Sequence, residues 1–243
     1  MSRPGRAVGR LVARHPGPAA FKGVYVTAFI GFGLFRGDDR VWSYIFVITV
    51  LLVTVAMIHG VARFSRPVVW AMATCGALHM AGGILPSPQP DTAILYETWL
   101  VDGLLKYDQV VHFLGTAVIT VACWELLGRY LDHTKATAAG QAALAAIMGV
   151  GFGAVNEVYE FVSAQRFTGL HIGGFENMGW DLVFNLAGAA TVAVFLGLAS
   201  PPASRAADRA DHRPTKKSRP HGEGPKTFSV GPATRARGSA TTR

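Results

Sequence analysis

Six long apolar stretches constrain the fold of this sequence more than any other feature. They cover about residues 18–35, 41–59, 67–85, 109–127, 139–163 and 178–198. A helix needs roughly 20 predominantly apolar residues to cross the ~30 Å hydrocarbon core of a bilayer. Charged residues make up 16% of the chain, against about 25% in ordinary soluble domains. We therefore expect an all-α fold, a polytopic membrane helix bundle with six transmembrane helices.

The charge is concentrated at the two ends of the chain. Residues 1–22 and 199–243 hold fifteen Lys and Arg against three acids, a net charge of +12, whereas residues 23–198 carry −4. Lys and Arg accumulate on the cytoplasmic side of membrane proteins, so this distribution predicts that the N- and C-termini are both cytoplasmic. No nucleic-acid-binding motif accompanies the charge, and we expect the partner to be the lipid bilayer and no nucleic acid.

Three segments follow from these patterns. Residues 1–17 are expected to form a basic cytoplasmic N-terminal segment, and residues 18–199 a six-helix transmembrane domain. Residues 200–243 are rich in Pro, Arg, Ser and Thr with almost no large apolar side chain, which predicts a disordered basic cytoplasmic tail. The expected location is the plasma or inner membrane of the cell, crossed several times.

Polar residues from four expected spans fall at the same depth, near the extracytoplasmic face. They are His79, Asp108, His112, Asn156, Glu157, Glu160, Asn177, Asp181 and Asn185. Ionisable groups inside spans are energetically costly, so their gathering at one depth indicates a site. The spacing supports this, since residues three or four apart share a helix face. Small residues beside them predict close helix packing; these are Gly149, Gly151, Gly153 and Gly188.

Three functional interpretations fit this set of residues. In the first, a divalent metal (Zn, Mn, Fe or Mg) acts on a lipid or lipid-linked envelope substrate, because oxygen and imidazole ligands suit these ions. The metal ligands would be His79, Asp108, His112, Glu157, Glu160 and Asp181. Glu157, Glu160 and Asp181 would be catalytic, and Asn156, Asn177 and Asn185 supporting.

In the second interpretation, the acids and histidines carry protons or ions in a transporter. In the third, they only specify helix packing, and the protein is a non-catalytic binding or structural protein. Asp108 and Asn177 could also act as helix caps, and His79 as a hydrogen-bonded structural histidine. The sequence contains no HExxH motif, nucleophile elbow or P-loop that would favour the enzyme.

Several segments resemble a known family. The sequences LHMAGG (78–83), YDQVVHF (107–113), NEVYEF (156–161) and GWDLVFNLAG (179–188) are similar to those of the YjdF-like family of bacterial inner-membrane proteins. They are more distantly similar to the VanZ-like family. Both families place an acid and a histidine one turn apart at the start of a span. The resemblance covers about residues 70–195 and implies a polytopic fold with a shared polar site, but no reaction.

Overall fold

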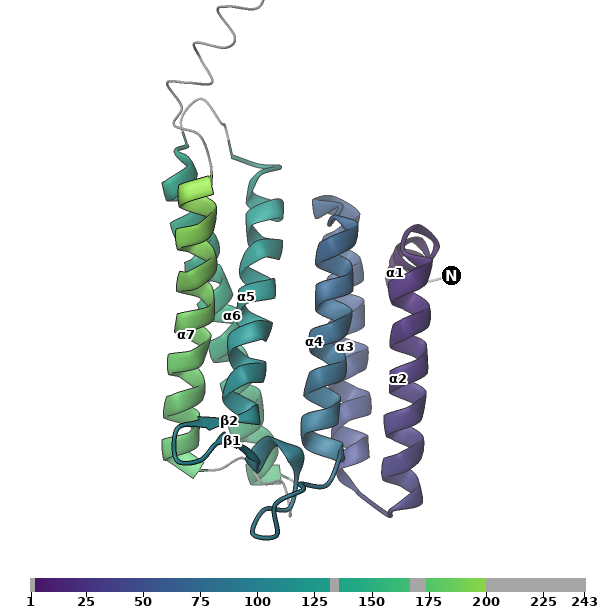
Figure 1. The fold of residues 1–243 in the computed structure, drawn as a ribbon. Coiled ribbons are helices and arrows are strands. Elements are labelled where there is room, and N and C mark those ends of the chain that lie inside the picture. Colours follow the sequence, from purple (N-terminus) through teal and green to yellow (C-terminus); the bar gives the residue numbers. More distant parts are fainter. Residues whose placement is uncertain (1–2, 132–135, 167–173, 200–243) are drawn as a thin grey trace, which may run out of the picture. The chain divides into compact units, whose positions relative to one another are not determined.

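The computed structural model describes residues 3–131, 136–166 and 174–199, and these residues form seven α-helices (Figure 1). The helices are α1 (Arg3–Arg14), α2 (Pro16–Phe35), α3 (Arg40–Ala62), α4 (Arg66–Ile84), α5 (Tyr107–Leu127), α6 (Ala138–Arg166) and α7 (Gly174–Ala199). From α2 to α7, all six are long and apolar enough to cross a membrane. The expected all-α fold and its six spans are therefore confirmed, with every helix end within four residues of its expected position. The expected tail, 200–243, lies outside the described residues.

The helices begin and end where local chemistry favours it. Pro16 and Pro67 lie in the first turns of α2 and α4, where the missing N–H of proline breaks no helical hydrogen bond. Gly37, with φ +69°, forms the turn between α2 and α3, a conformation that glycine adopts without strain. Arg63 closes α3 with a left-handed φ of 49°, and its N–H donates to the carbonyl of His59.

Packing divides the helices into neighbouring groups. The last three helices, α5, α6 and α7, pack against one another, while α4 contacts both α5 and α2 (Figure 1). Helix α1 packs along α3, with Ala7 and Leu11 buried against Ala56. The sequence had indicated a basic segment at this position, and the structure adds that it is a helix.

Large apolar side chains remain exposed along the outer faces of the long helices. Phe46 of α3, Val158 of α6 and Phe195 of α7 are 62%, 62% and 70% exposed. A surface of this kind is costly in water and is what a helix presents to lipid, so it fits a multi-pass membrane protein.

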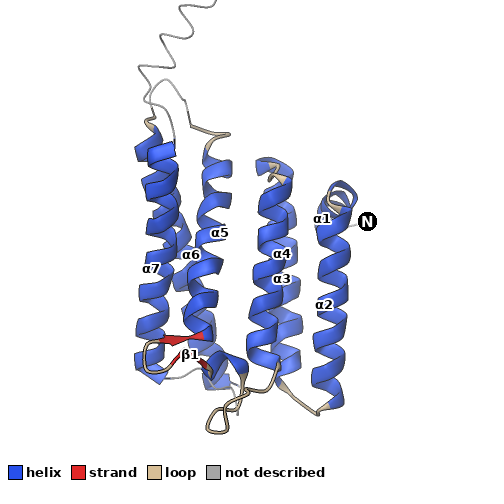
Figure 2. Cartoon of the chain, viewed as in Figure 1, coloured by secondary structure: helices blue, strands red, loops and turns tan. Residues whose placement is uncertain are grey.

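A short hairpin connects α4 to α5 (Figure 2). After the 3-10 helix η1 (Leu95–Glu97), the strands β1 (Trp99–Val101) and β2 (Leu105–Lys106) pair antiparallel. The side chain of Gln89 bonds both the N–H and the carbonyl of Trp99, at 2.9 and 3.0 Å. A Cβ at Gly82 would lie 2.5 Å from the ring of Tyr96, so glycine there lets the connection sit closely on the end of α4.

Candidate functional site

The end of the bundle next to the hairpin carries most of the polar residues singled out in the sequence. Asp108 and His112 lie in the first turns of α5, and Asp181 lies two turns into α7. Glu157 and Glu160 lie within the last three turns of α6. Because α6 runs opposite to α5 and α7, its C-terminal end meets their N-terminal ends. Five residues from three helices are thus brought to one level.

His112 lies at the centre of this group. Its Nε2 is 3.3 Å from Oδ1 of Asp108 and 4.0 Å from Oδ1 of Asp181, and its Nδ1 is 3.2 Å from Oε1 of Glu157. The imidazole therefore contacts acids from all three helices. The side chains of His112, Glu157 and Asp181 are 7%, 5% and 1% exposed, so these contacts are shielded from water.

Amide side chains hold the carboxylates in place. Nδ2 of Asn177 donates to Oδ2 of Asp108 at 3.0 Å and to Oδ2 of Asp181 at 2.6 Å. Asn177 therefore links α5 to α7 through side chains, beyond any role as a helix cap.

The other two acids receive amides of their own. Nδ2 of Asn185 donates to Oε1 of Glu157 at 3.2 Å, and Nδ2 of Asn156 donates to Oε1 of Glu160 at 2.7 Å. Each of the four carboxylates thus has one oxygen fixed by an amide, which sets the direction of the other.

The charge of the cluster is unbalanced. Asp108, Glu157, Glu160 and Asp181 bring four carboxylates, and an imidazolium at His112 would neutralise one of them. Oδ1 of Asp181 is buried and has no hydrogen-bond partner among the described residues. An uncompensated buried carboxylate costs several kcal/mol, of order 3–5 when a partner is missing. The geometry therefore calls for a further positive charge or for protons.

Four of these residues lie close enough together that they could hold a metal ion. Ligand atoms of His112, Glu157, Glu160 and Asp181 all lie within 4.8 Å of one another. Ligands at ~2.1 Å from an ion are at most ~4.2 Å apart, so these side chains would have to move closer together by a few tenths of an ångström or more to bind one ion. One imidazole and three carboxylates form a donor set that suits Zn, Mn, Fe or Mg.

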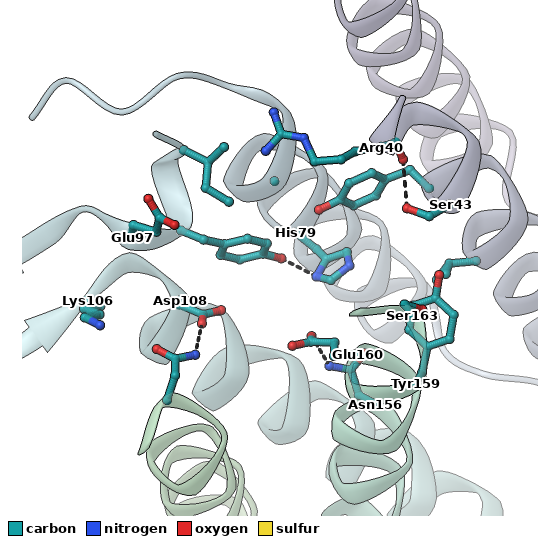
Figure 3. A pocket seen from close by; sticks show the side chains of 16 residues that line it. Arg40, Ser43, His79, Glu97, Lys106, Asp108, Asn156, Tyr159, Glu160 and Ser163 are labelled. Carbon is teal, nitrogen blue, oxygen red and sulfur yellow. Dashed lines mark hydrogen bonds between the residues drawn. The ribbon is translucent and has the colours of Figure 1, made fainter. Parts of the chain in front are cut away.

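A cavity of about 110 Å³ adjoins the cluster (Figure 3). It shares Asp108, Asn156, Glu160 and Asn177 with the polar group already described. Its remaining walls come from α3, α4, the hairpin connection and α6. The additional polar lining residues are Arg40, Ser43, Tyr44, His79, Tyr96, Glu97, Lys106, Tyr159 and Ser163.

His79 lies in this cavity and outside the four-residue cluster. Its Nδ1 shares a short hydrogen bond with the hydroxyl of Tyr96 (Figure 3). Burial, followed by neighbouring phenolic and acidic groups, raises the pKa of Tyr96 well above its usual value, so this phenol stays protonated and can donate. The sequence placed His79 and Asp108 among the metal ligands. In the structure His79 faces the adjoining space, and Asp108 contacts the cluster through His112.

Some residues that line the cavity or support the cluster carry a signal in the sequence. Tyr159 and Ser163 lie three and seven positions after Asn156, which is the spacing of one helix face. Thr116, which donates to Oδ1 of Asn185 at 2.5 Å, lies four positions after His112. Arg40 had no such signal, because it begins a different helix whose neighbours the sequence does not specify.

Residues 18–200 match the family described as "Predicted membrane protein (DUF2238)". The chain belongs to this family. The match covers the six long helices except for the first two residues of α2, and the family description specifies a membrane protein and no activity. No curated protein and no solved structure matches the chain.

Proposed function

We propose that this member of the DUF2238 family binds one divalent metal ion at His112, Glu157, Glu160 and Asp181. The ion would serve a hydrolase or transferase reaction on a lipid or lipid-linked component of the cell envelope. One observation carries the proposal: four ligand atoms from three helices converge within 4.8 Å, and one of these residues, Asp181, has a buried oxygen without a hydrogen-bond partner among the described residues.

The neighbouring side chains fit supporting roles around such an ion. With the Nε2–H of His112 directed to Asp108, the lone pair of Nδ1 faces Glu157 and the centre of the cluster. Histidines that bind metals commonly donate their other ring N–H to a carboxylate, which fixes the orientation of the ring. Asn156, Asn177 and Asn185 would fix the ligand carboxylates through the hydrogen bonds described above.

The catalytic roles follow from which ligands reach the cavity. A divalent ion can polarise a phosphoryl or carbonyl oxygen and activate water. Glu160 belongs to both the cluster and the cavity lining. The oxygen of Glu160 that does not bind the ion would accept the proton of an attacking water. Glu157 and Asp181 would hold the ion beside it.

We further propose that the site faces the outside of the plasma or inner membrane, with both termini in the cytoplasm. This orientation rests on the basic ends and on the positive-inside rule. It assigns 1–17 and 200–243 to the cytoplasm as the two basic segments. Within the family, the motifs around His112 and Asp181 favour the YjdF-like branch, with the VanZ-like proteins as more distant relatives.

Metal content tests the proposal. Protein purified in detergent and dialysed against metal-free buffer should retain about one Zn, Mn or Fe per chain by elemental analysis, or bind added Mg²⁺ or Mn²⁺ with that stoichiometry. Loss of a residue that hydrogen-bonds to a metal ligand typically weakens metal binding 10–100-fold. Asp181→Asn changes a ligand itself, so it should weaken binding by about 100-fold or more. Wild-type protein that neither retains nor binds a metal contradicts the proposal.

A matched control lies on the same helix. Glu176 is exposed in the first turn of α7, and Glu176→Gln should leave metal binding unchanged. Ion- or proton-driven uptake by vesicles containing metal-free protein would instead favour a transporter. Five alanine variants test the packing interpretation; they replace Asp108, His112, Glu157, Glu160 and Asp181. If none of them changes the metal content or the phenotype of the cell, these residues act only in helix packing.

A further inference from the structure

The cavity beside the cluster is lined by charges of both signs. Figure 3 shows Arg40 at the top of the view, Lys106 beside Asp108 at the left with Glu97 above them, and Glu160 below the centre. If the ion is bound as proposed, three carboxylate ligands and a divalent cation leave a net charge of about −1, and the carboxylates of Glu97 and Asp108 also line the cavity. An anionic substrate at that ion therefore needs further positive charge, and Arg40 and Lys106 are the basic residues that line the cavity.

Arg40 is held in a fixed direction. Its Nε and Nη2 donate to the two carboxylate oxygens of Asp38, each at 2.7 Å. A guanidinium has five N–H groups in a planar fork. The ion pair with Asp38 therefore uses one edge of the Arg40 guanidinium and fixes the direction of its remaining N–H groups. Burial acts to raise the pKa of Asp38, but the hydrogen bonds and charge of Arg40 outweigh it and hold that pKa below its usual value. The pair therefore stays ionised at neutral pH.

Lys106 is positioned by an aromatic ring. Its Nζ lies 4.9 Å from the centre of the Trp99 ring, across the β1–β2 hairpin. The amino group keeps three N–H donors for other acceptors. Arginine forks and lysine charges are the usual protein partners of phosphate oxygens.

The size and depth of the cavity restrict what can enter. A single water needs roughly 10–15 Å³ of such a volume, so about 110 Å³ has room for a polar headgroup. The lining residues of α3 and α7, from Arg40 to Val47 and at Asn177, lie within about two turns of the ends of these helices. The ends of membrane-spanning helices lie at the level of lipid headgroups.

We propose that this cavity binds the phosphate headgroup of an anionic lipid, with Arg40 and Lys106 on its phosphate oxygens and the metal on the opposite side. The inference rests on the proposed metal site and specifies its substrate class. A lipid and free inorganic phosphate offer the same recognition chemistry, and the experiment separates them.

Binding of three probes to metal-loaded protein in detergent tests the proposal. The probes are short-chain phosphatidic acid, the matching diacylglycerol, which lacks the phosphate, and inorganic phosphate. Phosphatidic acid should bind at least tenfold more tightly than either of the others. Equal binding of diacylglycerol would overturn phosphate recognition, and equal binding of inorganic phosphate would overturn the lipid as its source.

Variants identify the residues. Arg40→Gln and Lys106→Gln should each weaken phosphatidic acid binding by about tenfold or more, the loss expected for a charge-assisted hydrogen bond. Arg36→Gln is the control, because Arg36 precedes α3 by a few residues and packs over the ring of Phe32. Arg40→Gln also breaks the ion pair with Asp38, and a loss of folding would then lower binding as well. Lys106→Gln leaves that ion pair in place, so it serves as the second variant.

The metal content of each variant is measured in parallel. Arg40→Gln and Lys106→Gln should keep the metal, since neither residue belongs to the four-residue cluster. If both proteins hold the metal but wild type binds phosphatidic acid no more tightly than Lys106→Gln does, the headgroup proposal is overturned. The proposed metal site would then still stand. Loss of metal in wild type would instead remove the proposed function itself.

Discussion

At the residue scale, the site depends on His112, which has an acid at each ring nitrogen. Asp108 lies at Nε2 and Glu157 at Nδ1, and the ring is almost fully buried. In this arrangement one carboxylate can fix the tautomer while the other nitrogen faces a ligand or ion. The surrounding amides matter for the same reason, because they decide which carboxylate oxygens point to the centre.

Asn185 provides the clearest energetic test of this network. It is 2% exposed, accepts from Thr116 and donates to Glu157. Asn185→Ala should lower the free energy of unfolding by about 1–3 kcal/mol, because it removes the amide that donates to Glu157 and the buried acceptor of the Thr116 hydroxyl. Thr116→Val should cost about 1 kcal/mol. Chemical unfolding in detergent measures both.

A double-mutant cycle separates this contact from general destabilisation. The two changes together should cost less than their sum by at least about 0.5 kcal/mol, because the residues share one hydrogen bond. Thr191→Val on the same helix is the control, since Thr191 is exposed and donates to its own helix at Ala187. Strict additivity of Asn185→Ala with Thr116→Val would contradict the network.

Much of the site could be predicted from residue type and depth. Asp108, His112 and Asp181 stand out because ionisable side chains are rare within apolar spans, and their helical spacing sets their faces. The separation of His79 from the cluster could not be predicted. It depends on the packing of α4 against η1 and on the hydrogen bond to Tyr96, which no local pattern encodes.

At the element scale, glycines set how closely the site-bearing helices approach. A Cβ at Gly188 of α7 would lie 2.2 Å from the carbonyl oxygen of Phe113 in α5, and one at Gly153 would lie 2.8 Å from the side chain of Asn185. The first obstacle is backbone, which cannot rotate away. Close approach of α5 and α7 is what places Asp108 and His112 opposite Asp181.

Two glycines on α7 form a matched pair. Gly188→Ala should lower the free energy of unfolding by about 1–3 kcal/mol, because the methyl group would force the helices apart. Gly197→Ala should be neutral or stabilising by up to ~1 kcal/mol, since its Cβ meets nothing within 4 Å and alanine favours helix. Thermal unfolding in detergent compares them. Equal stability of the two variants would contradict the close α5–α7 contact.

The positions of the helices could be predicted from the sequence better than the contacts between them. Hydropathy located all six spans because each must meet the same length requirement. Small residues also indicated close packing, and Gly149, Gly153 and Gly188 do face neighbouring side chains or backbone. Gly151 meets nothing within 4 Å, because it lies on another face of α6. Helix α1 was not anticipated, since its Arg content suggested a basic segment and its short apolar stripe is easily overlooked.

At the scale of the whole membrane domain, one end carries the polar site and the long helices expose apolar side chains. The six long apolar helices indicate the protein class, because a helix needs roughly 20 predominantly apolar residues to cross a bilayer. The cavity could not be predicted, since it forms where α3 and α4 meet helices distant in the sequence.

The proposed orientation can be tested by labelling. In a variant with Cys75→Ala and Cys123→Ala, a single cysteine is introduced by Asp91→Cys in the connection before the hairpin or by Arg129→Cys after α5; both positions are exposed. A membrane-impermeant maleimide should label Asp91→Cys in right-side-out vesicles and should label Arg129→Cys only after permeabilisation, as the distribution of basic residues predicts. The reverse pattern would place the site on the cytoplasmic side.

The central claim, that the cluster binds a metal through His112, is tested most directly by pulsed electron paramagnetic resonance of Mn²⁺-loaded protein. We predict a nitrogen coupling from a directly bound imidazole in wild-type protein, retained in His79→Gln and lost in His112→Gln. A spectrum without nitrogen coupling, or one that loses it in His79→Gln and keeps it in His112→Gln, would contradict the account.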